Sequence, residues 1–205
     1  MVIAIDGPAG AGKSSVARAV AERLGFTYLD TGAMYRAVAL AAGERDDAAA
    51  VAEAAEIEVG ERVLLDGRDV TAEIRTPEVS ANASRVAADP GVRAALVRKQ
   101  QEIVRAGDWV AEGRDIGSVV APDAAVKVFL TASPEERARR RAAELQADPE
   151  QILREQQERD RRDASAERTV LEPAPDAVPL DTTGLSLDQV VEHIETLALE
   201  AKEIG

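Results

Sequence analysis

The chain contains no cysteine, very few aromatic residues and no long hydrophobic run. Without cysteine there is no disulfide framework, no thiolate nucleophile and no zinc–thiolate site. Because aromatic residues make up only 2% of the chain, alanine, valine, leucine and isoleucine must fill its core. No apolar stretch approaches the ~18 residues of a membrane span, and no signal peptide fits the N-terminus. These absences predict a soluble, cytoplasmic protein without membrane contact.

Positive charge is also scarce, since 25 lysines and arginines stand against 38 acidic residues, giving a net charge of −13. Proteins that bind nucleic acid in general present a basic face, so this balance argues against that class. Only four of the basic residues are lysines (13, 99, 127 and 202). Two interpretations of the arginine excess stay open: genomic codon bias, or a need for fork-shaped guanidinium groups that clamp phosphates.

The most specific motif lies in residues 2–15, VIAIDGPAGAGKSS. An apolar strand leads into the complete spacing G-x-x-x-x-G-K-S, which opens a helix. Glycines let backbone N–H groups converge on phosphate oxygens, the helix N-terminus adds positive potential, Lys13 reaches the outer phosphates and Ser14 can ligate Mg²⁺. The glycine order does not fit the dinucleotide fingerprint. The candidate triphosphate-binding residues are Gly7, Pro8, Ala9, Gly10, Ala11, Gly12, Lys13, Ser14 and Ser15.

Strand and helix patterns alternate along most of the chain. Five apolar runs predict core strands, at residues 2–5, 27–30, 109–111, 126–130 and 177–180. Because each run is joined to the next through helix, we expect an α/β fold. Its core is a doubly wound, five-stranded parallel sheet with helices on both faces and the phosphate loop after the first strand.

Residues 43–108 interrupt this alternation of strands and helices. Alternating apolar residues within 57–65, followed by an Asp-Gly turn, predict a small antiparallel sheet. Prolines at the first turn predict two helices that begin near residues 77 and 90. We therefore expect 43–108 to be a subdomain inserted into a core made of 1–42 and 109–205.

Two charged helices are expected towards the C-terminal end. The first has Ser133 at its N-cap and Glu136 at N3, and carries four arginines between 137 and 141. The second starts at Pro149 and is charged almost throughout. Weakly apolar helices are poor core elements and good mobile lids, so we expect a lid within about 142–168. Some of the four arginines are expected to contact ATP, and at least two to face solvent.

The phosphate loop is shared by GTPases, ATPases and kinases, so other features must separate these classes. The guanine-reading pattern Asn-Lys-x-Asp does not occur, which argues against a GTPase. A small chain, an insertion after the second strand and arginine-dense helices fit a small-molecule kinase. Such an enzyme must hold two anionic substrates and exclude water during transfer.

Six segments, in order between about residues 2 and 190, closely resemble the bacterial cytidylate kinases: IDGPAGAGKSS, LDTGAMYRA, EIRTPEV, AEGRDIG, VFLTAS-PEERARRR and ERDRRD. The resemblance implies ATP-dependent phosphorylation of CMP and dCMP with Mg²⁺, and a monophosphate-binding role for the insertion. Two alternatives stay open: a related kinase for another nucleoside monophosphate or a small metabolite, and a non-catalytic module that binds nucleotide to regulate a partner. The absence of long apolar surface helices favours a monomer.

The resemblance also implies roles for single residues. Lys13 would bridge the β- and γ-phosphates, Ser14 would hold Mg²⁺, and Arg114 would clamp phosphate as a second catalytic residue. Asp115 would accept from the cytosine amino group. The residues implied in CMP binding are Thr31, Tyr35 and Arg36 for the phosphate; Ser84, Arg93, Arg114 and Asp115; and Arg159 and Asp163 for the ribose.

One departure from the family pattern concerns the lid side. Ala166 stands where the family usually has an arginine, so either Arg168 takes its place or the contact is absent. Two carboxylates at expected strand ends, Asp30 and Glu112, have two open interpretations. Each either supports Mg²⁺ through water or serves as a structural cap.

Overall fold

The structure is a computed structural model that describes residues 1–165 and 172–204, without the side chains of 144, 145, 158–165 and 204. Packing divides the chain into two compact units. The first unit comprises Met1–Thr27 and Asp108–Gly205, and the second comprises Tyr28–Gly107.

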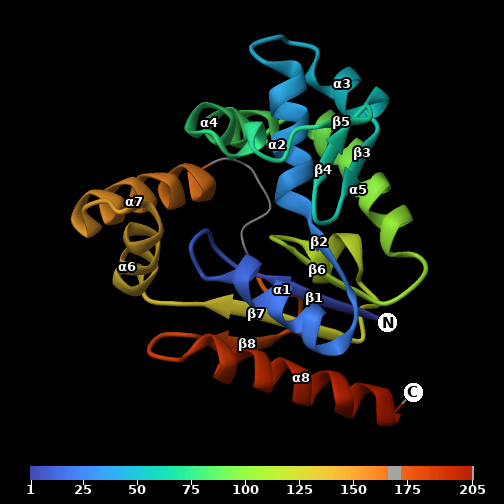
Figure 1. The fold of residues 1–205 in the computed structure, drawn as a ribbon, viewed down its shortest axis with the longest axis vertical. Coiled ribbons are helices and arrows are strands. Elements are labelled where there is room, and N and C mark those ends of the chain that lie inside the picture. The colour runs from blue at the N-terminus through green and yellow to red at the C-terminus, as the bar shows by residue number, and fades with distance from the viewer. Residues whose placement is uncertain (166–171, 205) are drawn as a thin grey trace. The chain divides into compact units, whose positions relative to one another are not determined.

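A five-stranded sheet, in the order β2-β6-β1-β7-β8, organises the core (Figure 1). Its β1–β6, β1–β7 and β7–β8 pairings are parallel. The fold class and all five core strands expected from the sequence are confirmed. Parallel strands bring their carboxyl ends to one edge, where ligands bind in open α/β sheets. The strands are β1 (Val2–Asp6), β2 (Thr27–Asp30), β6 (Trp109–Gly113), β7 (Val126–Thr131) and β8 (Val178–Asp181).

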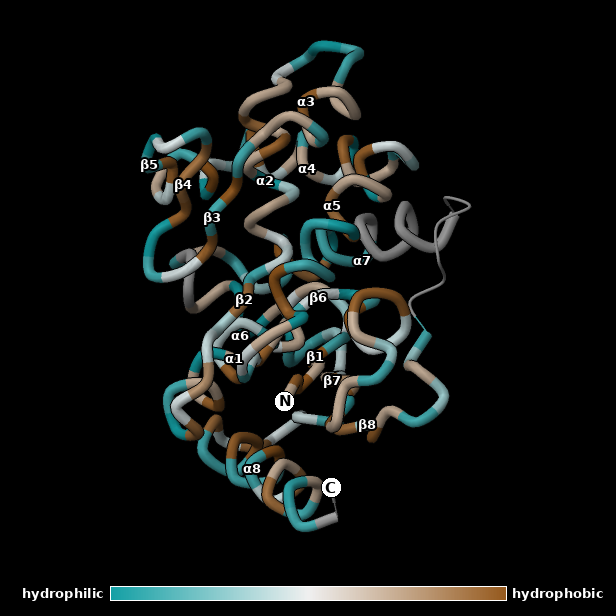
Figure 2. Tube along the Cα trace, turned by 90° about the vertical axis from the view of Figure 1, so that its right-hand side faces the viewer, coloured by the Kyte–Doolittle hydropathy of each residue, from teal (hydrophilic) through white to brown (hydrophobic). Residues whose placement is uncertain are grey.

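Helices α1 (Lys13–Leu24) and α8 (Leu187–Ile204) pack against each other beside this sheet (Figure 1). In Figure 2 brown and teal alternate along α8, because one face of this helix is apolar and buried while the other is polar. A capping box forms at its start. Gln189 N–H donates to the Ser186 hydroxyl at 3.3 Å, and Ser186 N–H donates to the Gln189 side chain at 2.9 Å.

Helices α6 (Pro134–Leu145) and α7 (Pro149–Ser165) pack through the small apolar cluster of Ala138, Ala142 and Ile152. The Ser133 hydroxyl caps α6 by accepting from Glu136 N–H at 3.2 Å. In a capping box, Ser133 N–H would donate to the Glu136 side chain. Here it donates to the Thr183 hydroxyl instead, at 2.9 Å. Among the helices that the structure describes, none has both the length and the apolar composition needed to cross a membrane.

The second unit combines helices with the small antiparallel sheet β3-β4-β5, as expected from the sequence. By its packing α2 belongs to this unit, so the compact unit begins at Tyr28, while the functional boundary at residue 42 stays a prediction. Thr76 and Asp89 cap the two helices that begin with proline. The elements are α2 (Thr31–Ala42), α3 (Ala48–Ala54), β3 (Ile57–Val59), β4 (Val63–Leu65), β5 (Arg68–Asp69), the 3₁₀ turn η1 (Glu73–Arg75), α4 (Pro77–Val86) and α5 (Pro90–Val104).

Candidate functional site

The phosphate loop joins β1 to α1, and its glycines adopt conformations that other residues rarely reach. Gly10 and Gly12 have positive φ angles of 79° and 87°. At Gly7 a Cβ atom would lie 2.1 Å from the Leu130 carbonyl oxygen on β7, so no larger residue fits. All nine predicted triphosphate-binding residues lie in this loop and the first turn of α1.

The start of α1 has the properties of an anion site. No side chain caps it and its first turn carries no acidic residue, so its backbone N–H groups face no competing carboxylate there. Lys13 donates from Nζ to the Pro8 carbonyl oxygen at 2.8 Å, which places its ammonium group over the loop. Ser14 is exposed on the same turn.

Two of the four α6 arginines reach the phosphate loop. Arg137 is buried and donates to the Ala9 carbonyl oxygen at 2.9 Å. Arg140 Nη1 lies 3.5 Å from the position of a Cβ built on Gly12. Arg139 and Arg141 are exposed, as expected for the solvent-facing part of this cluster. ATP contacts by Arg137 and Arg140 stay predictions.

Arg140 is held by partners on both sides. Its Nε donates to Glu136 at 2.8 Å, and its two terminal nitrogens donate to the hydroxyl and the carbonyl oxygen of Thr182, at 2.9 and 2.7 Å. Hydrogen bonds from Arg139 and then Arg140 lower the pKa of Glu136 from 4.5 to about 2. The Thr182 contact could not be predicted from any local motif, because 42 positions separate the two residues.

Arg114 and Asp115 follow β6 and are half-buried, directly before the π-helical turn η2 (Ile116–Val120). Sequence reasoning missed the residue that anchors this turn, Asp6. Its carboxylate accepts from Ile116 N–H and Gly117 N–H, each at 2.8 Å, and burial raises its pKa. In the sequence, the one feature that could have indicated this role is that an acidic residue ends an otherwise apolar strand.

In the second unit, Asp30 organises the predicted monophosphate strip at the start of α2. Its Oδ1 accepts from Ala33 N–H at 2.8 Å and so caps the helix. Its Oδ2 accepts from Arg36 at 2.8 Å, which fixes the guanidinium group at the start of the helix that also carries Thr31 and Tyr35. Of the two interpretations of Asp30, the structure therefore shows the structural cap. Glu112 is buried within β6.

Ser84 and Arg93 lie on α4 and α5 of the second unit, both half-buried. Helix α4 is tied to the C-terminal end of α2. Asn82 donates to the Ala39 and Gly43 carbonyl oxygens at 2.9 and 2.8 Å, and Arg85 also donates to Gly43, at 2.7 Å. The helix of Ser84 is thereby fixed to the helix of the monophosphate strip.

The predicted ribose contacts cannot be placed in the same way. Arg159 and Asp163 belong to α7, but their side chains lie outside the described part of the structure. Ala166 and Arg168 also lie outside the described residues.

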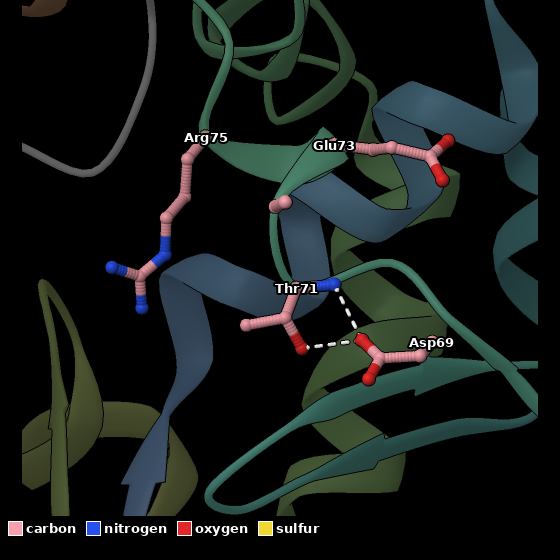
Figure 3. A pocket seen from close by; sticks show the side chains of 5 residues that line it. Asp69, Thr71, Glu73 and Arg75 are labelled. Carbon is pink, nitrogen blue, oxygen red and sulfur yellow. Dashed lines mark hydrogen bonds between the residues drawn. The ribbon is translucent and has the colours of Figure 1, made fainter.

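A shallow pocket in the second unit is lined by Asp69, Thr71, Ala72, Glu73 and Arg75 (Figure 3). Asp69 accepts from the backbone and hydroxyl groups of Thr71 at 3.0 and 2.7 Å, which closes a local turn. None of the residues predicted to bind nucleotide lines this pocket, so we assign no nucleotide to it.

The described residues contain no group of three or more His, Cys, Asp or Glu side chains arranged to hold a metal ion. Mg²⁺ keeps several waters and is commonly held by substrate phosphates with one or two protein oxygens, so a bound Mg²⁺ needs few protein ligands and stays a prediction. The exposed Ser14 hydroxyl at the start of α1 is a suitable protein oxygen.

Comparison with known sequences gives matches over almost the whole chain. Residues 3–200 match a family described as cytidylate kinase. A cytidylate kinase of Solibacter usitatus is 52% identical over 95% of this chain and 90% of its own length. Another, of Desulforamulus reducens, is 50% identical over 98% of this chain and 97% of its own.

Solved structures with the same fold share much less sequence. A gluconokinase from Sinorhizobium meliloti superposes with a TM-score of 0.57 at 19% identity, covering 99% of this chain and 94% of its own. An uncharacterized protein from Eubacterium ventriosum gives a TM-score of 0.58 at 12% identity, covering 96% of each chain. At these identities the likeness concerns the fold alone.

Proposed function

Because the chain belongs to the cytidylate kinase family, we propose that it transfers the γ-phosphoryl group of ATP to CMP and dCMP, giving CDP and dCDP. The observation that carries this proposal is 52% identity to a cytidylate kinase over 95% of the chain. The phosphate loop and the Asp30–Arg36 strip support it, since they supply two separate anion-binding groups.

The proposed mechanism depends on alignment and charge. The phosphate oxygen of CMP is already an anionic nucleophile, so the reaction needs no strong general base. Mg²⁺ bound with ATP, held on the protein side by Ser14, would neutralise part of the phosphate charge. Lys13 contacts the β- and γ-phosphates, and Arg114 offsets charge on the phosphoryl group during in-line transfer.

Binding of the CMP phosphate is assigned to Thr31, Tyr35 and Arg36, together with Arg114. The ion pair with Asp30 holds Arg36 in one orientation before substrate arrives, which reduces the entropy lost on binding. The ribose contacts are assigned to Arg159 and Asp163.

Base selection is assigned to Asp115, with Ser84 and Arg93. A carboxylate accepts a hydrogen bond from the exocyclic amino group of cytosine. UMP presents a carbonyl oxygen there, so two acceptors would face each other in a dry pocket. Mismatched buried polar groups can discriminate by roughly 10⁴ or more.

The experiment that tests this assignment is Asp115→Ala, with kcat/KM measured for CMP and UMP. We expect the preference for CMP to fall by about two orders of magnitude, because the carboxylate that rejects the uracil carbonyl is gone. Asp123→Ala, at an exposed carboxylate in the same stretch of chain, is the matched control. An unchanged preference in Asp115→Ala would show that another group reads the base.

Several further assignments stay predictions. They are the division into a kinase core (1–42 and 109–205), a monophosphate-binding subdomain (43–108) and a lid within about 142–168, the cytoplasmic location, the monomeric state, and the absence of nucleic-acid and membrane partners.

A further inference from the structure

Asp6 is the only charged residue of β1, and it lies directly before the phosphate loop. We propose that Asp6 is a positioning residue for base selection, because its carboxylate fixes the turn that carries Arg114 and Asp115. This inference rests on the proposed function, in which Arg114 and Asp115 bind CMP.

The turn is anchored on both sides of these two residues. On one side, Gly113 at the end of β6 pairs in register with Asp6 itself. On the other, the Asp6 carboxylate accepts from Ile116 N–H and Gly117 N–H at 2.8 Å each. Arg114 and Asp115 are the only residues between the two anchors, so the backbone of Asp6 and its side chain together determine where they lie.

The carboxylate of Asp6 also caps the start of η2, where the side chain of Asp115 could have served as the cap. Asp115 occupies the N-cap position of η2, where an aspartate commonly caps with its own side chain. Here its side chain makes no cap hydrogen bond, and the N–H groups at the start of the turn are satisfied from β1.

Close packing keeps the turn against Asp6. A Cβ atom on Gly117 would lie 3.2 Å from Lys127 Cδ and 3.4 Å from Asp6 Oδ2, so this position has little room to move. The Lys127 ammonium group is bound elsewhere, to Asp176 and to the Pro122 carbonyl oxygen. Asp6 itself is only 6% exposed. Burying a carboxylate costs stability, and an apolar residue would continue the strand pattern, so the placement points to a role in function.

The test is Asp6→Asn, which keeps the shape of the side chain. Its amide oxygen accepts from one N–H group, while its amino group opposes the other. We expect KM for CMP to rise about tenfold and the CMP/UMP ratio of kcat/KM to fall by a similar factor, with KM for ATP changing less than about twofold. Asp188→Asn, at an exposed aspartate on α8 that pairs with Arg23, is the matched control.

Gly117→Ala gives a second, independent test, since it displaces the same turn without changing charge. We expect Gly117→Ala also to lower the CMP/UMP ratio of kcat/KM. If Asp6→Asn does not fold, this variant provides the test. An unchanged ratio in either folded variant, or equal rises in KM for CMP and ATP, would overturn the positioning role alone. An unaltered chain that does not phosphorylate CMP would overturn the proposed function and this inference together.

Discussion

Single carboxylates fix the geometry of three segments predicted to bind nucleotide. Asp6 holds the turn after β6, Asp30 holds Arg36, and Glu136 holds Arg140 beside the phosphate loop. Each accepts hydrogen bonds of 2.8 Å from groups that are predicted to lie near a bound phosphate or base. Hydrogen bonds to charged groups are shorter and stronger than neutral ones, which suits this positioning role.

Glu136→Gln tests one of these carboxylates through the pH dependence of stability. Arginine donors lower the pKa of Glu136 from 4.5 to about 2. A carboxyl group whose folded-state pKa is lowered stabilises the fold above its unfolded pKa, and this stabilisation is lost as the pH falls from about 4.5 towards 2. We expect the variant to lose about 1 kcal/mol of unfolding free energy at pH 7 and less at pH 3, measured by urea denaturation.

Glu135→Gln is the control for this measurement, because Glu135 is exposed in the same helical turn. A loss for Glu136→Gln that is the same at pH 7 and pH 3 would show that the ionised carboxylate does not carry the effect.

The sequence predicted those site residues that belong to local motifs, and it missed those that act across the fold. Lys13, Arg36 and Asp115 stand within recognisable short patterns. The partners of Asp6 are 110 and 111 positions away, and that distance is set by the sheet order and not by any local spacing.

Among the helices, α2 and α4 behave as one element. The Asn82 side-chain amide donates to two carbonyl oxygens at the C-terminal end of α2, those of Ala39 and Gly43. Because α2 carries Tyr35 and Arg36, and α4 carries Ser84, these hydrogen bonds form a joint that fixes the predicted phosphate-binding residues relative to a residue predicted to read the base.

Asn82→Ala removes the joint. We expect the free energy of unfolding to fall by about 1–3 kcal/mol, since the Ala39 carbonyl oxygen loses the Asn82 donor. KM for CMP should rise several-fold while KM for ATP stays close to that of the unaltered chain. Thermal unfolding and steady-state kinetics check both effects, with Glu78→Ala, exposed on the same helix, as control. Equal rises in the two KM values would contradict a joint that acts on the CMP side.

Element boundaries were predictable where local chemistry determines them. Pro77 and Pro90 begin α4 and α5 as expected, and Ser133 caps α6. The π-helical turn η2 was not predicted. Its first N–H groups donate to the Asp6 carboxylate on another element, and no residue within 114–120 indicates this contact. Helix α2 packs with the second unit because it is hydrogen-bonded to α4. The sequence of α2 contains no pattern that predicts this contact.

Across the whole molecule, arginine serves two purposes. Arg36, Arg137 and Arg140 lie at segments predicted to bind phosphate. Others, such as Arg62 and Arg98, form exposed ion pairs, with 73% and 61% of their side chains accessible. Phosphate clamping therefore does not by itself explain the abundance of arginine.

The proposed activity requires one chain to bind two nucleotides and to transfer a phosphoryl group between them. The fold class followed from the alternating pattern and the phosphate loop, since these fix a parallel sheet with helical crossovers. The choice of CMP as acceptor rests instead on family membership and on the residues assigned to base reading.

The most direct test is an ATP-coupled assay of the purified chain with Mg²⁺ and each of CMP, dCMP, UMP and AMP, with Lys13→Ala measured in parallel. With CMP we expect CDP and ADP in equal amounts. We also expect kcat/KM for CMP and dCMP to be at least about 100-fold above that for UMP and AMP, and kcat to fall by orders of magnitude in Lys13→Ala. A preference for AMP or UMP, ATP binding without monophosphate-dependent ADP release, or a Lys13→Ala variant that keeps most of its turnover would contradict the proposed function.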